Sequence, residues 1–419
     1  MTYLDTICDT PLVRLRRALP GAAKHARVLA KLEMQNPGGS LKDRIALGLI
    51  TGAEAAGKIV PGKTTIIEYT SGNTAIGLAM VCAAKGYSCI LVMPQLEVMK
   101  ERYMICRSFG AEVHLTAPAL GVVGMQEHVG QLLRENADFW CPQQFNNQMN
   151  PFMHEGTTGP EIWRQSRERV DYFICGIGTG GTVSGVGRYL KEKNPNVKII
   201  AVEPSESRTH VGETHTPHSI VGLGPGISSK FIEALDPGKP LEDGPRGFVD
   251  EFQHANSEQA IEWAKRMTRM EGIMVGPSSG AVMHVAAEVA ARPEAKGKTI
   301  VVIIASHGIR YTHHAMWEHL NAESVMALPT VPDMTPEPLL KWPLDRNTPA
   351  AIQEVTKEIH VAAIVKGRVG PSARSRAEAE ETATEASKLT SLSAVDFGSE
   401  VHTSPKLSPS LGAAAPPYR

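Results

Sequence analysis

The segment NPGGSLKDRIA, residues 36–46, contains a lysine whose surroundings favour a reactive amine. Glycines end an irregular stretch there, and Ser40 can cap a helix that has Lys42 in its first turn. Cations are disfavoured near a helix N-terminus, so this position lowers the pKa of the amine. A partly neutral amine can form a Schiff base with a carbonyl compound. The alternative is a solvated lysine beside the surface pair Asp43 and Arg44.

A glycine-rich loop, GIGTGGTVSGVGRYL at residues 176–190, follows the apolar run YFIC and opens a helical pattern. Its glycines let the backbone approach an anion closely, and its threonines add hydroxyls: Gly178, Thr179, Gly180, Gly181 and Thr182. Successive backbone N–H groups at a helix N-terminus bind phosphate. The alternative is a tight turn that needs positive φ angles. The P-loop lysine and an acidic ribose ligand are both missing, which disfavours a nucleotide.

Two other glycine-containing loops also precede helical patterns. EYTSGNTAIGLA, residues 68–79, presents N–H groups and short polar side chains that suit a carboxylate: Thr70, Ser71, Gly72, Asn73 and Thr74. EGIMVGPSSGAVM, residues 271–283, places Ser278 where its hydroxyl can bond a heteroaromatic nitrogen. Each loop has a structural alternative, because Ser71, Asn73 or Ser278 can instead cap a helix.

Together, a reactive lysine, a phosphate loop, a carboxylate loop and a neutral hydroxyl are the parts that hold pyridoxal phosphate with an amino acid attached. The sequence resembles the fold-type II pyridoxal-phosphate enzymes, specifically the cysteine synthase and cystathionine β-synthase family, which is similar to the tryptophan synthase β chain. The resemblance covers residues 4–311 in one order. It includes DTPLVRL, NPGGSLKDRI, TSGNT, QQFNN, TTGPEIW, GTGGTVSG and VGPSSGA.

The resemblance implies a role for each motif. Lys42 would bind the cofactor covalently and later move the α-proton of the substrate. Gly178, Thr179, Gly180, Gly181 and Thr182 would bind the cofactor phosphate, Asn73 its phenolic oxygen and Ser278 its pyridine nitrogen. The substrate carboxylate would be held by Thr70, Ser71, Gly72, Asn73, Thr74 and Gln144. A serine cannot keep the pyridine nitrogen protonated as an aspartate would, so this site suits loss of a β-substituent rather than transamination.

The implied reaction is β-replacement on an activated serine, with O-acetylserine and sulfide giving cysteine and acetate. One alternative is cystathionine β-synthase, which joins serine and homocysteine. Another is a catalytically silent family member that binds a partner such as serine acetyltransferase; the intact Lys42 counts against it. The family also implies a homodimer. The chain departs from the family at Tyr69, where proline is usual, at Ala75, where glycine is usual, and in segments 94–99 and 305–311.

The elements that must position these motifs alternate between short apolar runs and helical patterns. The expected strands span residues 28–34, 65–70, 88–94, 112–116, 172–178, 198–204 and 299–306. Expected helices span residues 41–58, 73–86, 127–136, 182–193, 257–272 and 280–292. Strands that are apolar throughout are covered on both faces. We therefore expect an α/β fold with two doubly wound, mostly parallel-sheet domains and the cofactor in the cleft between them.

The remaining expectations concern the domains, the C-terminal segment, the partners and the location of this chain of 419 residues. The large domain should comprise residues 1–44 and 149–325, and the small domain residues 45–148. Eleven of 29 prolines follow residue 328, so residues 329–419 are expected to form a largely disordered tail. With 43 Lys and Arg against 44 Asp and Glu, nucleic acid or a membrane surface is not the expected partner. Six scattered cysteines and no apparent signal peptide favour the cytoplasm, and no metal site is expected.

Overall fold

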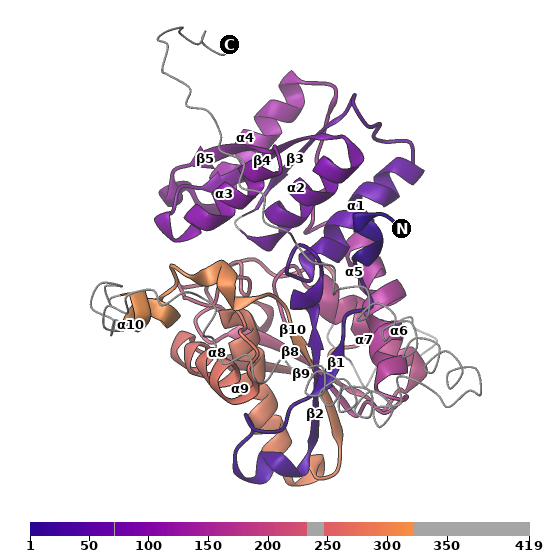
Figure 1. Ribbon diagram of the computed structural model, residues 1–419, viewed down its shortest axis with the longest axis vertical. Coiled ribbons are helices and arrows are strands. Elements are labelled where there is room, and N and C mark those ends of the chain that lie inside the picture. Colours follow the sequence, from indigo (N-terminus) through magenta and orange to yellow (C-terminus); the bar gives the residue numbers. More distant parts are fainter. Residues whose placement is uncertain (71, 233–246, 322–419) are drawn as a thin grey trace, which may run out of the picture. The chain divides into compact units, whose positions relative to one another are not determined.

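The computed structural model describes residues 1–70, 72–232 and 247–321, all within one compact unit, Met1–Leu328 (Figure 1). The larger of its two sheets has the strand order β1-β2-β10-β7-β8-β9. The strands are β1 (Leu12–Arg14), β2 (Arg27–Leu32), β7 (Tyr172–Gly176), β8 (Lys198–Pro204), β9 (Glu251–Ala255) and β10 (Thr299–Ile304). β1 pairs antiparallel with β2, and the other pairs are parallel. The predicted tail, residues 329–419, lies outside the described residues.

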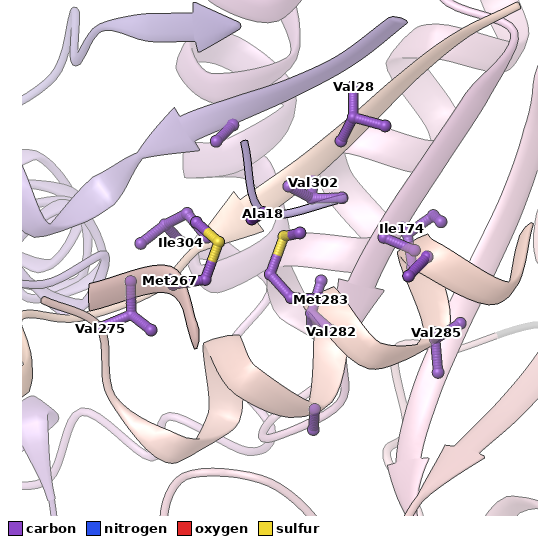
Figure 2. Packing of buried hydrophobic residues seen from close by; sticks show 14 of the residues in the cluster. Ala18, Val28, Ile174, Met267, Val275, Val282, Met283, Val285, Val302 and Ile304 are labelled. Atoms are coloured by element: carbon purple, nitrogen blue, oxygen red, sulfur yellow. The ribbon is translucent and has the colours of Figure 1, made fainter. Parts of the chain in front are cut away.

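Both faces of the larger sheet are covered, because its strands are apolar at successive positions. In β10, Val302 and Ile304 belong to a core with Met267 of α8 (Ser257–Glu271) and Met283 of α9 (Pro277–Ala291), as Figure 2 shows. The alternate residues of β10, such as Val301, pack in a second core with α7 (Gly181–Lys193). Side chains of a strand alternate between faces, so each strand contributes to both cores.

The smaller sheet has the strand order β5-β4-β3-β6 and is parallel throughout. Its strands are β3 (Thr65–Tyr69), β4 (Ser88–Pro94), β5 (Glu112–Thr116) and β6 (Phe139–Trp140). Helices α2 (Asn73–Lys85) and α3 (Lys100–Ser108) share a core with one face of this sheet. Helix α4 (Gly121–Glu135) packs against the other face through Met125 and Val129.

Helix α1 (Lys42–Ala55) takes part in the cores of both sheets. Ile45 and Leu49 pack in the core that contains α7, whereas Ala46 and Ile50 pack in the core that contains α2. All four side chains are fully buried. The helix that begins at Lys42 is therefore the element that the two sheets share.

Short helices complete the described part of the chain. They include α5 (Met149–Met153), a π-helical turn (His154–Thr158), α6 (Gly159–Gln165), α10 (Glu318–Asn321) and 3-10 helices η3 (Glu33–Gln35), η7 (Thr209–Val211) and η10 (Gly308–Tyr311). Further 3-10 helices are η1 (Tyr3–Thr6), η2 (Gly21–His25), η4 (Glu97–Met99), η5 (Pro118–Leu120), η9 (Pro293–Ala295) and η11 (Ala315–Trp317). Across the described ranges, no helix has both the length and the apolar character needed to cross a lipid bilayer.

A buried network of charged side chains connects α1 to residues of β2, η3 and α6. Arg44 forms ion pairs of 2.6 Å with Glu33 and with Glu161, and Lys31 lies 2.6 Å from Glu161. Thr10 donates a hydrogen bond of 2.7 Å to Glu33. Burial alone would raise the pKa of Glu33, but the Arg44 charge holds it below its ordinary value. The network's stabilisation is therefore present at neutral pH and is lost as the pH falls below 4.5, the ordinary glutamate value.

We predict that Glu33→Gln destabilises the protein by about 3–5 kcal/mol, because it leaves the buried guanidinium of Arg44 with too little negative charge. Urea denaturation of the cofactor-free protein measures the loss in the free energy of unfolding. The control is Glu97→Gln, which removes an exposed pair with Lys100 and should change the free energy little. Equal stability of the two variants would contradict the prediction.

Candidate active site

The lysine segment and the three glycine-containing loops of the sequence analysis each contribute residues to a single cavity. Among the predicted site residues, the lining includes Lys42, Asn73, Gly178, Thr179, Gly180, Thr182 and Ser278. The lining also contains residues that the sequence motifs did not single out for the site: Leu41, Cys175, Gly176, Gly222, Leu223, Val282, Ile303, Ala305, Ser306 and Tyr311. Gly181, Thr70, Gly72, Thr74 and Gln144 do not line this cavity, and Ser71 lies outside the described residues.

The cavity lies where parallel strands end and helices begin. Residues just after β7 and β10 line it, and four helices have their first residues in it or next to it. These helices are α1, α2, α7 and α9, which begin at Lys42, Asn73, Gly181 and Pro277. Ligands bind at the carboxyl ends of strands in open α/β sheets, and helix N-termini carry partial positive charge. Four such termini make the cavity suitable for an anion.

Lys42 is the first residue of α1, and Leu41 before it already has helical φ and ψ angles. The Ser40 hydroxyl accepts a hydrogen bond of 3.2 Å from the Lys42 N–H, two residues further on, as a capping side chain does. Desolvation of the amine is the main cause that lowers the pKa of Lys42 to about 8. In the described part of the chain, no hydrogen bond engages this amine. It is therefore available for a carbonyl group.

The glycine-rich loop is hydrogen-bonded to side chains that the sequence analysis did not assign to the site. Gly180 has a φ of 85°, which explains glycine at this position. Asn150 donates a hydrogen bond of 2.9 Å to the Thr179 hydroxyl, and the Thr182 hydroxyl lies 3.1 Å from Nε2 of His154. Burial lowers the pKa of His154 well below its usual value, so this ring is neutral. Positive potential for an anion here comes from backbone N–H groups rather than from His154.

The carboxylate loop and Gln144 are joined by direct hydrogen bonds. Thr74 donates to Oε1 of Gln144 over 2.7 Å, which leaves the Gln144 NH₂ group free to bind an acceptor. Glu68 accepts from the Gln144 N–H over 3.1 Å and from the Tyr69 N–H over 3.1 Å. Burial raises the pKa of Glu68 to about 7. Proline, usual in the family at position 69, could not donate that second hydrogen bond.

Asn73 is oriented by residues that follow β10 in the sequence. Its Nδ2 donates to the Tyr311 hydroxyl over 3.1 Å, and Arg310 donates to its Oδ1 over 3.3 Å. The Tyr311 and Ser306 hydroxyls lie 2.8 Å apart. Tyr311 and Ser306 line the cavity but were not predicted as site residues. Their polar types after a buried strand were the available signal.

Ser278 lies in the first turn of α9, where no side chain caps the helix, because the cap residue is Gly276. The capping alternative for Ser278 is therefore wrong. A Cβ added to Gly222 would lie 3.9 Å from the Ser278 hydroxyl, so glycine leaves room beside it. Cys175 lines the same region, and burial raises the pKa of its thiol to about 12. The Ser278 hydroxyl could therefore bond a neutral nitrogen that belongs to a flat ring.

The donor set fits a phosphorylated aromatic aldehyde. A buried amine, a positive-φ glycine loop with N–H groups and a serine hydroxyl lie in one cavity, a donor set typical of an enzyme that uses a cofactor of this chemistry. A family model described as "Pyridoxal-phosphate dependent enzyme" matches residues 3–306. The chain belongs to this family.

Relatives and solved structures agree with this assignment. "Cysteine synthase 3" of Caenorhabditis elegans is 44% identical over 307 residues, which are 73% of this chain and 87% of the relative. A crystal structure of cysteine synthase from Entamoeba histolytica is similar with a TM-score of 0.69 and 37% identity, covering 76% of this chain and 90% of that one. The structure of an O-ureido-L-serine synthase has a TM-score of 0.70 and 35% identity, with coverages of 78% and 98%.

We predict that Gly180→Val weakens pyridoxal phosphate binding more than Asn73→Ala does. A Cβ at position 180 would lie 2.1 Å from the Ser229 hydroxyl and would occupy a backbone with a φ of 85°. Asn73→Ala removes the one hydrogen bond expected to the cofactor, worth about 0.5–1.5 kcal/mol, besides the bonds to Tyr311 and Arg310. Titration of cofactor-free protein with pyridoxal phosphate measures both dissociation constants.

Gly57→Val is the control for backbone strain in this comparison. Gly57 has a φ of 65°, with open space around its Cβ position. It should therefore show the strain without the loss of cofactor binding. Equal affinities of the Gly180 and Asn73 variants would mean that residues 178–182 form only a turn.

Proposed function

We propose that this chain catalyses β-replacement on O-acetylserine with sulfide, giving cysteine and acetate. The observation that carries the proposal is the make-up of the cavity. Within the described residues, its lining has the Lys42 amine and neutral donors but no aspartate, glutamate or histidine. The names of relatives such as cysteine synthase 3 support the same reaction.

The proposed binding roles follow the sequence motifs. The loop Gly178, Thr179, Gly180, Gly181 and Thr182 binds the cofactor phosphate, Asn73 the phenolic oxygen and Ser278 the ring nitrogen. Thr70, Ser71, Gly72, Asn73, Thr74 and Gln144 hold the substrate carboxylate. The free NH₂ group of Gln144 and the N-terminus of α2 support this second assignment. The proposed division into a large domain, 1–44 with 149–325, and a small domain, 45–148, separates these two groups of loops.

Lys42 is the residue proposed to carry protons. When bound, pyridoxal phosphate withdraws electrons from the α-carbon of an attached amino acid. An amine with a pKa of about 8 exchanges protons readily near neutral pH. Lys42 can therefore take the α-proton and hold it inside the cavity. The neutral hydroxyl of Ser278 leaves the ring nitrogen without a full positive charge.

The leaving group follows from the acids that are within reach. Hydroxide is the base of an acid with a pKa of about 15.7, so its loss from serine needs a positioned acid. A carboxylate is the base of an acid with a pKa of about 4 and leaves without that help. Since the described lining offers no carboxylic acid or histidine, it favours O-acetylserine over serine. The alternative of serine with homocysteine would have to use Lys42 as the acid.

Assembly is proposed from the family resemblance, and location from the six scattered cysteines. The chain is proposed to form a homodimer in the cytoplasm and to bind serine acetyltransferase. A catalytically silent role limited to such a partner is disfavoured, because Lys42 is present with a lowered pKa.

We predict that Lys42→Ala abolishes the visible absorption of the bound cofactor while circular dichroism shows an unchanged fold. In the unmodified protein, mass spectrometry after borohydride reduction should find the cofactor on Lys42. Covalent capture of added pyridoxal phosphate should rise with pH around a midpoint of about 8, because the neutral amine reacts. Lys63→Ala, at an exposed position, is the control. Cofactor on another lysine would contradict the assignment.

A substrate comparison tests the proposed reaction. Purified protein is given O-acetylserine with sulfide, or serine with homocysteine, and products are measured by mass spectrometry. We expect kcat/KM for the first pair to exceed that for the second by about tenfold or more, a difference of about 1.4 kcal/mol in activation free energy. Faster formation of cystathionine would replace the proposal with its alternative.

A further inference from the structure

Glu203 and His210 form a buried pair that the proposed reaction does not use. Glu203 is the next-to-last residue of β8 and is 1% exposed, and His210 lies in η7. Glu203 lies 2.7 Å from Nδ1 of His210 and accepts a second bond of 3.2 Å from the His210 backbone N–H. The His210 ring stacks on Phe252 of β9, with centroids 5.9 Å apart. Among the described residues, no group of three or more His, Cys, Asp and Glu side chains is arranged to hold a metal ion.

The hydrogen bonds define the protonation of the His210 ring. Nε2 lies 2.9 Å from the backbone nitrogen of Ser229, which can only donate. Nε2 must therefore accept, which requires that it carries no proton. The ring proton is then on Nδ1, where it is donated to Glu203. In this arrangement the hydrogen bonds to Glu203 and from the Ser229 N–H fix the orientation of the His210 ring.

Ser229 in turn contacts the glycine-rich loop. Its hydroxyl donates to the Thr179 carbonyl over 2.7 Å and accepts from the Phe231 N–H over 3.1 Å. It also occupies the space next to Gly180 where a Cβ would lie. Thr179 and Gly180 line the cavity, whereas Ser229 and His210 do not.

The bond to Thr179 has a consequence for the next peptide N–H. In a trans peptide the carbonyl oxygen and the following N–H point to opposite sides. A Thr179 carbonyl held toward Ser229 therefore directs the Gly180 N–H away from Ser229. That N–H is a donor of the proposed phosphate site.

We propose that Glu203, His210 and Ser229 are positioning residues that hold the loop Gly178–Thr182 in the conformation that binds the cofactor phosphate. The proposal rests on the phosphate-binding part of the proposed function. It explains why a carboxylate and a histidine are buried together outside the cavity. These three residues would change cofactor affinity by fixing the backbone of the loop.

The first experiment compares two variants of similar length and shape. His210→Gln offers an oxygen that can accept from the Ser229 N–H, whereas His210→Met offers only a weakly accepting sulfur. Cofactor-free proteins are titrated with pyridoxal phosphate, and their unfolding temperatures are measured without cofactor. We expect His210→Met to bind the cofactor about tenfold more weakly, as the loss of about one hydrogen bond predicts, and His210→Gln to stay close to the unmodified protein.

Ser228→Ala is the matched control, because the Ser228 hydroxyl bonds to the Thr209 carbonyl over 3.0 Å and does not contact the loop. It should leave cofactor affinity unchanged. Ser229→Ala should weaken binding, and adding it to His210→Met should cost less than the sum of the two, because both interrupt one path.

Two results would overturn the proposal. One is an unchanged cofactor affinity in both His210→Met and Ser229→Ala. The other is an equal loss of affinity in His210→Met and His210→Gln with an equal fall in unfolding temperature, which would indicate general destabilisation. Neither readout needs turnover. Absence of cysteine formation by unmodified protein that binds the cofactor would therefore count against the proposed reaction and not against this positioning role.

Discussion

Helix α1 is packed into two hydrophobic cores at once, and the position of Lys42 depends on that packing. Ile45 and Leu49 belong to one core and Ala46 and Ile50 to the other, so rotation of the helix would remove apolar side chains from both. The buried ion pairs of Arg44 prevent the helix from sliding along its axis. The position of the amine at the first residue of α1 is thus fixed by both cores. The loops that form the rest of the cavity have to lie close to this amine.

Convergence of those loops is achieved by side chains that bridge separate segments. Asn150 donates to the Thr179 hydroxyl and also to the Gln144 carbonyl, over 2.9 and 2.8 Å. Asn73, at the start of α2, is bonded to Tyr311 beyond β10. Through these contacts, the segment proposed for the cofactor phosphate is connected to the one proposed for the substrate carboxylate. The two segments are thus connected by a few directional hydrogen bonds.

Strands with β-branched residues could be predicted well from the sequence: β4, β5 and β8 have the expected bounds. β9 was missed because EFQHA contains no β-branched residue, and α3 because its sequence is strongly polar. The glycine motifs predicted the cavity, since each supplies a local conformation that its own residues determine. Asn150, His154 and Tyr311 could not be predicted, because their importance arises from contacts with residues far away in the chain. Desolvation of Lys42, likewise, depends on burial by segments that no single motif contains.

The burial of Cys175 determines how reactive its thiol is toward compounds in the cavity. A thiol with a pKa of about 12 is ionised in only about one molecule in 10⁵ at pH 7, so the cysteine that lines the cavity is a very weak nucleophile. Of the six cysteines, five are buried, and burial also raises the pKa of Cys106 and Cys141. A reactive thiol in the cavity would otherwise compete with free sulfur nucleophiles for the same electrophile. Burial makes the protein's own sulfur inert where free sulfur compounds are to react.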